Sequence, residues 1–277
     1  SERGELHMEF LAAQHTDIGT CKGTNQDSIC IMEAQTGDGN VLFAAVCDGM
    51  GGLEQGEVAS AQMIGELSAW FARQLPAQLV CPDPVSEVRW CWDRMFKRVN
   101  QQLAAYGRQH RIHMGTTATA LVVLPNGSYL IGHVGDTRVY RISDQHIRAV
   151  TEDQTMVARE VQQGRLTPEE AEADPRRSVL LQCIGASRIV EPVYYSGRVV
   201  PDECWLLCSD GFRHEISAQE IQEALRPESN RSEADMERHL RTLVETDKDR
   251  MEQDNISAIL IRTVKGELGH GGYRADH

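Results

Sequence analysis

Short apolar runs with the residue preferences of β-strands follow one another along most of this chain. The run Val41–Val46 is continuous and ends in Cys47-Asp48-Gly49, which is typical of a strand buried on both faces. Asn126-Gly127 lies between two such runs and predicts a tight hairpin. The other predicted strands are Met8–Gln14, Ser28–Glu33, Thr116–Leu124, Ser128–His133, Thr137–Ile142, His146–Val150, Val179–Cys183, Ile189–Tyr195, Cys204–Cys208 and Ile256–Thr263.

Helical periodicity appears in separate blocks. Apolar residues at helical spacing predict an amphipathic helix over Glu57–Leu75 and a second one carrying the stripe from Val88 to Leu103. Shorter helices are predicted at Thr155–Gln163, Thr167–Ala173, after the capping box Ser217-Ala218-Gln219-Glu220, and around Met236–Val244. Strands and helices do not alternate regularly, so the pattern predicts an α+β fold with antiparallel sheets.

Composition narrows the functional classes. The 277 residues carry a net charge of −13, which disfavours a nucleic-acid or anionic-membrane surface as partner. No apolar run is long enough to cross a bilayer. The eight cysteines show no zinc-finger spacing, and we expect reduced thiols in a cytoplasmic protein. We expect one domain over residues 8–265, with 1–7 a possible cloning remnant and 266–277 a disordered tail.

Aspartates recur where the apolar runs begin or end. Asp48, Asp136 and Asp210 follow predicted strands, and Asp254 precedes the last one. Together with Asp27 they offer hard oxygen ligands without a matching histidine or cysteine set, which favours Mg²⁺ or Mn²⁺ over Zn²⁺. Two such ions about 3.5–4 Å apart can lower the pKa of a water and hold a phosphoryl group.

The aspartates also allow simpler interpretations. Each Asp-Gly pair can be an ordinary turn, and the aspartates could hold calcium for structure alone, although no EF-hand spacing is present. His133 could act as a general acid, but a single histidine in a strand is more often packed in the core.

The motifs taken together resemble those of the metal-dependent protein phosphatases, the PPM or type 2C family, in their bacterial form. They run in the family's order from Thr16 to Thr263, and one of them is the stretch from Cys47 to Ser60, similar to D-G-M-G-G-x-x-x-G-E-x-A-S. The other motifs are Lys22–Asp27, Gly115-Thr116-Thr117, Gly135–Arg138, Ser209-Asp210-Gly211 and Asp254-Asn255. Residues 164–177 are similar to the flap of bacterial members.

The resemblance implies a β-sandwich of two antiparallel sheets flanked by helix pairs, with two or three Mn²⁺ or Mg²⁺ ions at one edge. In this chain Asp48 and the Gly49 carbonyl, Asp210 and Asp254 would be ligands. Asp27 would act through a metal-bound water, and Asp136 would help to hold a third ion. The implied reaction is hydrolysis of phosphoserine and phosphothreonine in proteins by a hydroxide that bridges two metals, opposing a protein kinase in signalling.

The chain also departs from the family pattern. Lys22 stands at the position of the usual phosphate-binding arginine, Gln26 where glutamate is common, and Gln154 where histidine is common. By the resemblance, Lys22 would bind the substrate phosphate. A catalytically silent family member that acts as a binding or regulatory module is the alternative function, although every metal-site aspartate is present.

Overall fold

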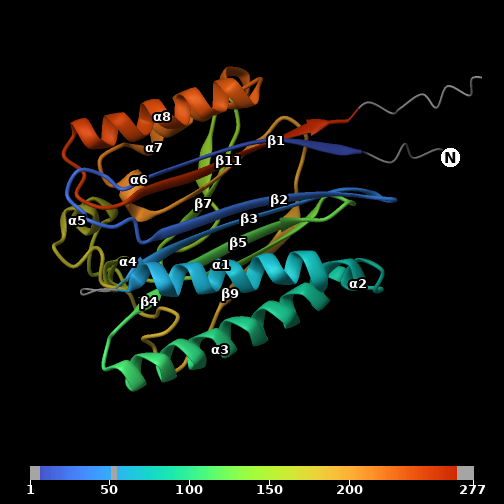
Figure 1. The fold of residues 1–277 in the computed structure, drawn as a ribbon. Helices are drawn as coiled ribbons and strands as arrows, with labels where there is room; N and C mark the ends of the chain where they lie inside the picture. The colour runs from blue at the N-terminus through green and yellow to red at the C-terminus, as the bar shows by residue number, and fades with distance from the viewer. Residues whose placement is uncertain (1–6, 51–54, 267–277) are drawn as a thin grey trace, which may run out of the picture.

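Two antiparallel sheets lie face to face, with helices on both outer sides, in a computed structural model that describes residues 7–50 and 55–266 (Figure 1). One sheet has the strand order β1-β11-β10-β7-β8, and the other has the order β2-β3-β5-β6-β9, with β4 paired to β3. The first sheet contains β1 (Met8–Asp17), β7 (Arg138–Ile142), β8 (Ile147–Ala149), β10 (Cys204–Cys208) and β11 (Ile256–Lys265). The second contains β2 (Asp27–Thr36), β3 (Gly39–Met50), β4 (Gly115–Thr116), β5 (Ala118–Val123), β6 (Ser128–Val134) and β9 (Val193–Arg198).

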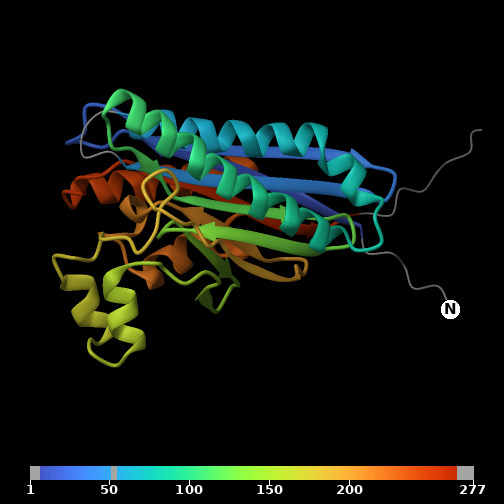
Figure 2. The ribbon, with the colours of Figure 1, turned by 90° about the horizontal axis from the view of Figure 1, so that it is seen from below.

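The helices form two outer layers and a small projection. α1 and α3 cover the second sheet, α8 and α7 lie beside the first, and α4 and α5 project from one end of the sandwich (Figure 2). Their bounds are α1 (Gly56–Arg73), α2 (Leu75–Leu79), α3 (Pro84–His110), α4 (Met156–Gln162), α5 (Pro168–Ala173), α6 (Asp210–Arg213), α7 (Ala218–Leu225) and α8 (Glu233–Asp249), with a 3₁₀ turn at Pro227–Ser229. The α+β sandwich predicted from the sequence is therefore confirmed.

The strand β3 is buried on both faces, which explains its continuous apolar run. Phe43 and Cys47 point into the layer between the second sheet and its helices, whereas Leu42 and Val46 pack between the two sheets. Alternate side chains of a strand face opposite sides, so one uninterrupted run supplies two hydrophobic layers. Polar residues would be costly on either face of such a strand.

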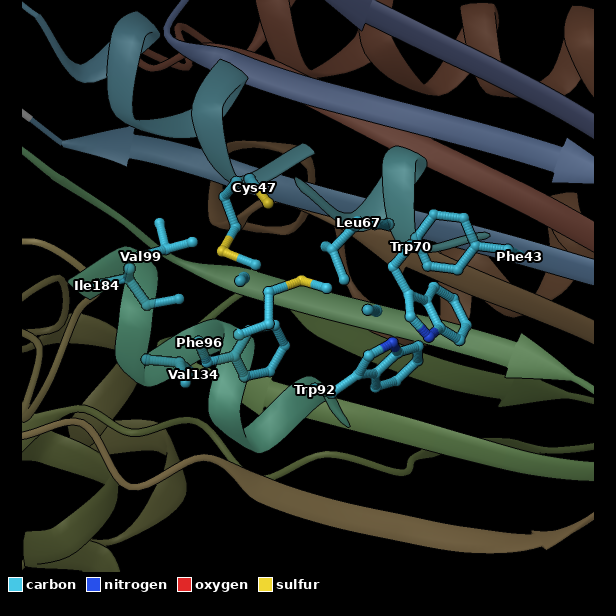
Figure 3. Packing of buried hydrophobic residues seen from close by; sticks show 14 of the residues in the cluster. Phe43, Cys47, Leu67, Trp70, Trp92, Phe96, Val99, Val134 and Ile184 are labelled. Carbon is cyan, nitrogen blue, oxygen red and sulfur yellow. The ribbon is translucent and has the colours of Figure 1, made fainter. Parts of the chain in front are cut away.

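Aromatic residues form the centre of the helix-covered layer. Trp70 of α1 meets Trp92 of α3 edge to face, with ring centroids 5.0 Å apart, and Phe43 of β3 lies 5.6 Å from Trp70 (Figure 3). Fully burying such rings contributes roughly 1.5–3 kcal/mol each. The stripe from Val88 to Leu103 is thus a core face of α3, which fixes this helix against the sheet.

Several predicted strand boundaries are wrong. The segment Val179–Cys183 is no strand: Leu180 makes only an isolated bridge to Thr155, and the neighbouring backbone groups bond to Gln154 and Met156. The run Ile189–Tyr195 is displaced to β9, because pairing with β6 sets its register. The predicted strand Thr116–Leu124 is split at Thr117, whose hydroxyl accepts a hydrogen bond from the amide of Asp48.

Other predictions hold in detail. The hairpin at Asn126-Gly127 joins β5 to β6, with Gly127 in the left-handed region at φ 81°. Ser217 and Glu220 form the predicted capping box of α7. All eight cysteines are free thiols, and no described helix is apolar over enough length to cross a membrane.

The two ends of the predicted domain lie side by side in the structure. The amide of Gly266 donates a hydrogen bond to the carbonyl of His7 over 2.7 Å, so both residues belong to the ordered body. The rest of the predicted remnant and of the predicted tail, residues 1–6 and 267–277, lies outside the described residues. The single domain over residues 8–265 stays a prediction.

Candidate metal centre

Antiparallel pairing brings the aspartates of distant segments to one end of the sandwich. Asp27 opens β2 directly opposite Asp48 near the end of β3. In the other sheet Cys208 pairs with Ala258, so Asp210 just after β10 lies near Asp254 just before β11. Asp136 lies in the connection between β6 and β7. Each aspartate is therefore placed where an apolar strand stops and polar groups become possible.

Hydrogen bonds tie the two sheets together at this end. The Ser257 hydroxyl donates to Asp27 Oδ2 over 2.6 Å, and the Gln26 amide donates to Asn255 Oδ1 over 3.0 Å. The result is a cluster in which one carboxylate oxygen each of Asp48, Asp210 and Asp254 lies within 4.8 Å of the others. Within residues 7–50 and 55–266 it is the one group of three or more histidine, cysteine or acidic side chains so close together.

The electrostatics of the cluster favour a bound cation. Burial, and to a smaller extent the charges of neighbouring carboxylates, raise the pKa of Asp27 to about 7 and that of Asp48 well above its usual value. Asp27 Oδ1 and Asp210 Oδ1 are buried and have no hydrogen-bond partner in the described protein. Carboxylates held together in this way repel one another unless protons or cations lie between them. The donor set thus fits divalent metal ions.

Glycines allow the backbone to close tightly around this end. A Cβ on Gly49 would come within 2.5 Å of the Gln26 carbonyl, and one on Gly211 would collide with the carbonyl of Asn255. Both residues directly follow an aspartate of the cluster, so their missing side chains let neighbouring strands approach the carboxylates. The Gly51-Gly52 part of the motif lies outside the described residues.

The remaining predicted residues surround the cluster without joining it. Asp136 is 4% exposed, and its burial and the charge of Asp210 raise its pKa. Lys22 Nζ lies 3.6 Å from Asp254 Oδ1, with a half-exposed side chain at the rim. The structure thus places Asp136 and Lys22 beside the three aspartates. The metal-binding and substrate-binding roles of all these residues, Gly49 included, stay predictions.

One histidine that no sequence motif singled out, His214, contacts the cluster. His214 Nε2 lies 3.5 Å from Asp210 Oδ2, and its Nδ1 lies 3.5 Å from Glu252 Oε2. The other Glu252 oxygen accepts hydrogen bonds from the amides of Gln253 and Asp254. His214 therefore links the two acidic segments. The only sequence signal was its position four residues after Asp210, one helical turn away.

Buried charges also hold the Asp136 connection. Arg213 Nη2 donates to the carbonyl of Asp136 and to Asp153 Oδ2, both over 2.8 Å. Arg138 forks onto the two Asp153 oxygens over 3.0 and 2.6 Å. Because Arg213 closes α6, which begins at Asp210, this network couples the positions of Asp210 and Asp136.

His133 is a packed residue, as the simpler interpretation expected. It is fully buried, with Nδ1 2.9 Å from the Thr119 hydroxyl and Nε2 2.9 Å from the Glu152 carbonyl. Burial lowers the pKa of His133 to about 4, so the ring is neutral near pH 7. Gln154 accepts from the Gly135 amide over 2.8 Å and so supports the Asp136 connection.

Comparison with known proteins agrees with this geometry. Residues 20–260 match the family model described as protein phosphatase 2C. The chain is 31% identical over 210 residues to the protein phosphatase PhpP of Streptococcus pneumoniae, an alignment that covers 75% of this chain and 81% of PhpP.

Solved structures show the same architecture. The serine/threonine phosphatase Stp1 of Staphylococcus aureus superposes with a TM-score of 0.81 at 30% identity, over 96% of this chain and 99% of Stp1. The catalytic domain of the serine/threonine phosphatase PstP, solved with two manganese ions, superposes with a TM-score of 0.75 at 27% identity, over 93% of this chain and 99% of that domain.

Proposed function

Starting from the fact that the chain belongs to the protein phosphatase 2C family and is a bacterial-type protein serine/threonine phosphatase, we propose that the aspartate cluster is its metal-dependent active site. The observation that carries the proposal is the approach of Asp48, Asp210 and Asp254 to within 4.8 Å. The two manganese ions in the related PstP domain support divalent cations as cofactors, and we propose manganese or magnesium here.

We assign Asp48, Asp210, Asp254 and the Gly49 carbonyl as the groups that would hold two ions. Asp136 would contribute to a third. When bound, the ions supply a water of lowered pKa and positive charge for the phosphoryl oxygens. Ser257 fixes one oxygen of Asp27, so the other remains free to accept a hydrogen bond from a water at the centre. His214 and Arg213 hold Asp210 and Asp136 in place.

The proposed reaction is hydrolysis of phosphoserine and phosphothreonine in proteins. The substrates would be products of a serine/threonine kinase, whose effect the enzyme reverses. Lys22 is the exposed cation at the rim that would meet the incoming phosphate.

Substitution of Asp210 by asparagine tests the proposal. Asp210→Asn removes one negative charge from the cluster while keeping the side chain's size, so metal affinity and turnover should fall together. Loss of a group that only orients a ligand costs about 10–100-fold, and loss of a ligand should exceed about 100-fold. The measurements are hydrolysis of a phosphothreonine peptide and the rise in melting temperature on adding Mn²⁺.

Asp38→Asn is the matched control, because Asp38 is exposed in the turn at the opposite end of β2 and β3. This variant should keep full activity and the full Mn²⁺-induced rise. Undiminished turnover in Asp210→Asn would refute the assignment. A wild-type protein that binds Mn²⁺ but hydrolyses no phosphopeptide would instead favour the catalytically silent binding module.

A further inference from the structure

A pocket lies at the C-terminal end of α3. Its volume is about 360 Å³, and its lining includes Arg108, Arg111, His113, Met114 and Gly185. Apolar walls with a few polar side chains are typical of sites that hold part of a ligand. None of the roles assigned above uses this pocket.

The charge of the pocket is opposite to that of the molecule. In a chain of net charge −13, three basic side chains, Arg108, Arg111 and His113, are exposed around one opening. Within the described part of the chain none of the three makes an ion pair or a side-chain hydrogen bond, whereas most other arginines near the centre are paired, Arg138 and Arg213 among them. The cluster therefore has unused capacity to bind an anion.

The backbone connects the pocket directly to the metal centre. Met114 precedes β4, in which Thr116 pairs with Gly49, and the next amide, that of Thr117, donates to the Asp48 carbonyl over 2.9 Å. Two residues lie between Met114 and Thr117, so three extended steps of about 3.3 Å, or about 10 Å in all, separate them. Backbone hydrogen bonds of 2.8 and 2.9 Å between Thr116 and Ile184 bring Gly185, which lines the pocket, next to β4. The end of α3 lies at the same end of the sandwich as α4 and β4 (Figure 1).

Arg111 occupies an unfavourable backbone conformation. It caps α3 in the left-handed region, at φ 56° and ψ 40°, where glycine or asparagine is usual. A substitution to glycine would relieve this strain while removing the charge. Stability and charge can therefore be separated experimentally at this position.

We propose that this basic pocket binds an acidic or phosphorylated side chain of the same substrate polypeptide whose phosphoserine or phosphothreonine enters the metal centre. The backbone span from Met114 at the pocket to Thr117 at Asp48, about 10 Å, equals roughly three residues of an extended peptide. Charge complementarity selects the occupant, because an anion is the group that two unpaired arginines and a histidine on an acidic protein would recognise. The inference rests on the proposed phosphatase function and specifies its substrate class.

The test compares four substrates of one enzyme preparation. The first is a phosphothreonine peptide with neutral flanks. The second carries glutamates two to four residues from the phosphothreonine, and the third carries a second phosphothreonine in the same range. The fourth is p-nitrophenyl phosphate. The wild type should show the lowest KM for the anionic peptides. The arms with carboxylate and phosphate identify which anion the pocket prefers.

Three variants, Arg108→Gln, Arg111→Gly and His113→Gln, should each raise KM for the anionic peptides by roughly two- to fivefold, the range for exposed charge pairs. Turnover of p-nitrophenyl phosphate should not change, because a small ester does not reach the pocket. Arg111→Gly should melt at the same or a higher temperature. Arg94→Gln is the matched control. Arg94 is exposed on α3, 14 residues before Arg108 and therefore about 21 Å away along the helix.

The outcomes are separable. Equal KM values for neutral and anionic peptides in the wild type, or unchanged preference in all three variants, would overturn the pocket as an anion site while leaving the phosphatase function intact. The same rise in KM with Arg94→Gln would show a general charge effect and would also overturn it. No hydrolysis of any of the four substrates by the wild type with Mn²⁺ would instead refute the proposed function.

Discussion

Two aspartates at the metal-centre end of the sandwich each have one carboxylate oxygen held by a specific hydrogen-bond or charged partner and one left open. The open oxygens point to a cation-binding role. Asp27 has one oxygen bound by Ser257 and one without a partner, and Asp210 has one oxygen beside His214 and one without a partner. A buried oxygen without a partner is costly to the folded protein, and a cation in the centre would remove that cost. Each of these carboxylates is thus supported on one side and leaves its other oxygen open to the proposed metal ions.

Lys22 stands at the position where the family resemblance leads us to expect a phosphate-binding arginine. Its ammonium lies 3.6 Å from Asp254, but both side chains are about a third or more exposed, so the pair adds little to stability. Lysine offers one compact charge on a flexible stem, whereas arginine can grip two phosphate oxygens. Its contribution should therefore appear in substrate binding.

Lys22→Ala should raise KM for a phosphopeptide more than it lowers kcat, the sign of lost ground-state binding. Lys22→Arg should keep or improve KM. Steady-state kinetics at low ionic strength give the largest effect, since salt screens exposed charges. If alanine leaves both constants unchanged there, Lys22 does not bind the phosphate.

At the scale of elements, the sheets supply rigidity, and the aspartates proposed as metal ligands lie at strand ends or just beyond them. β3 is locked by hydrophobic layers on both faces and carries Asp48 near its end. By contrast, Ala171 is the only buried residue of the segment 164–177, which contains α5. The contact between Arg177 and Glu215, at 3.8 Å, is long and partly exposed. This segment, proposed as a flap, can therefore change with little cost to the core.

Replacing residues 164–177 by a short glycine-serine linker should alter kcat/KM on a phosphoprotein more than on p-nitrophenyl phosphate, because only a protein substrate is large enough to contact the flap. The melting temperature should fall little, since almost no apolar surface of the segment is buried. Equal losses on both substrates would show that the segment only supports the fold.

At the scale of the whole molecule, acidity and burial couple metal binding to pH. Burial raises the pKa of Asp27 from 3.8 to about 7, and that of Asp254 is raised as well. A folded carboxyl of raised pKa keeps its proton where the unfolded one has lost it. Its contribution to stability is complete below the unfolded pKa and is lost as the pH rises through the folded pKa. For Asp27 this window runs from about 4 to about 7.

Metal-free protein should therefore lose stability across this window, whereas metal ions replace the protons. We expect the rise in melting temperature caused by Mn²⁺ to be larger at pH 7.5 than at pH 5.5, by several degrees. Differential scanning fluorimetry of chelator-treated and Mn²⁺-loaded protein measures this rise in melting temperature. Asp210→Asn is the control, and its melting temperature should respond weakly to Mn²⁺ at both pH values. An equal rise at both pH values would contradict this coupling.

Much of the fold could be read from local sequence. Cys204–Cys208 is a strand with the predicted bounds, and the helix α1 differs by one or two residues at its ends. These elements have strong periodicity or long apolar runs, so their structure depends little on distant partners. The strands that were misplaced, around Val179 and Ile189, are short, and their backbone partners lie 23 residues (Met156 to Val179) to 70 residues (Ser128 to Arg198) away along the chain.

For the candidate centre, the sequence by itself determined which aspartates stand at strand edges and, through the ordered motifs, which family they resemble. Only the tertiary structure decided that Asp48, Asp210 and Asp254 converge, because that depends on antiparallel register and on bonds between the sheets such as Ser257 to Asp27. His214 and the basic pocket at Arg111 had no motif to reveal them. Their surroundings come from segments far apart in sequence, and only packing brings those segments together.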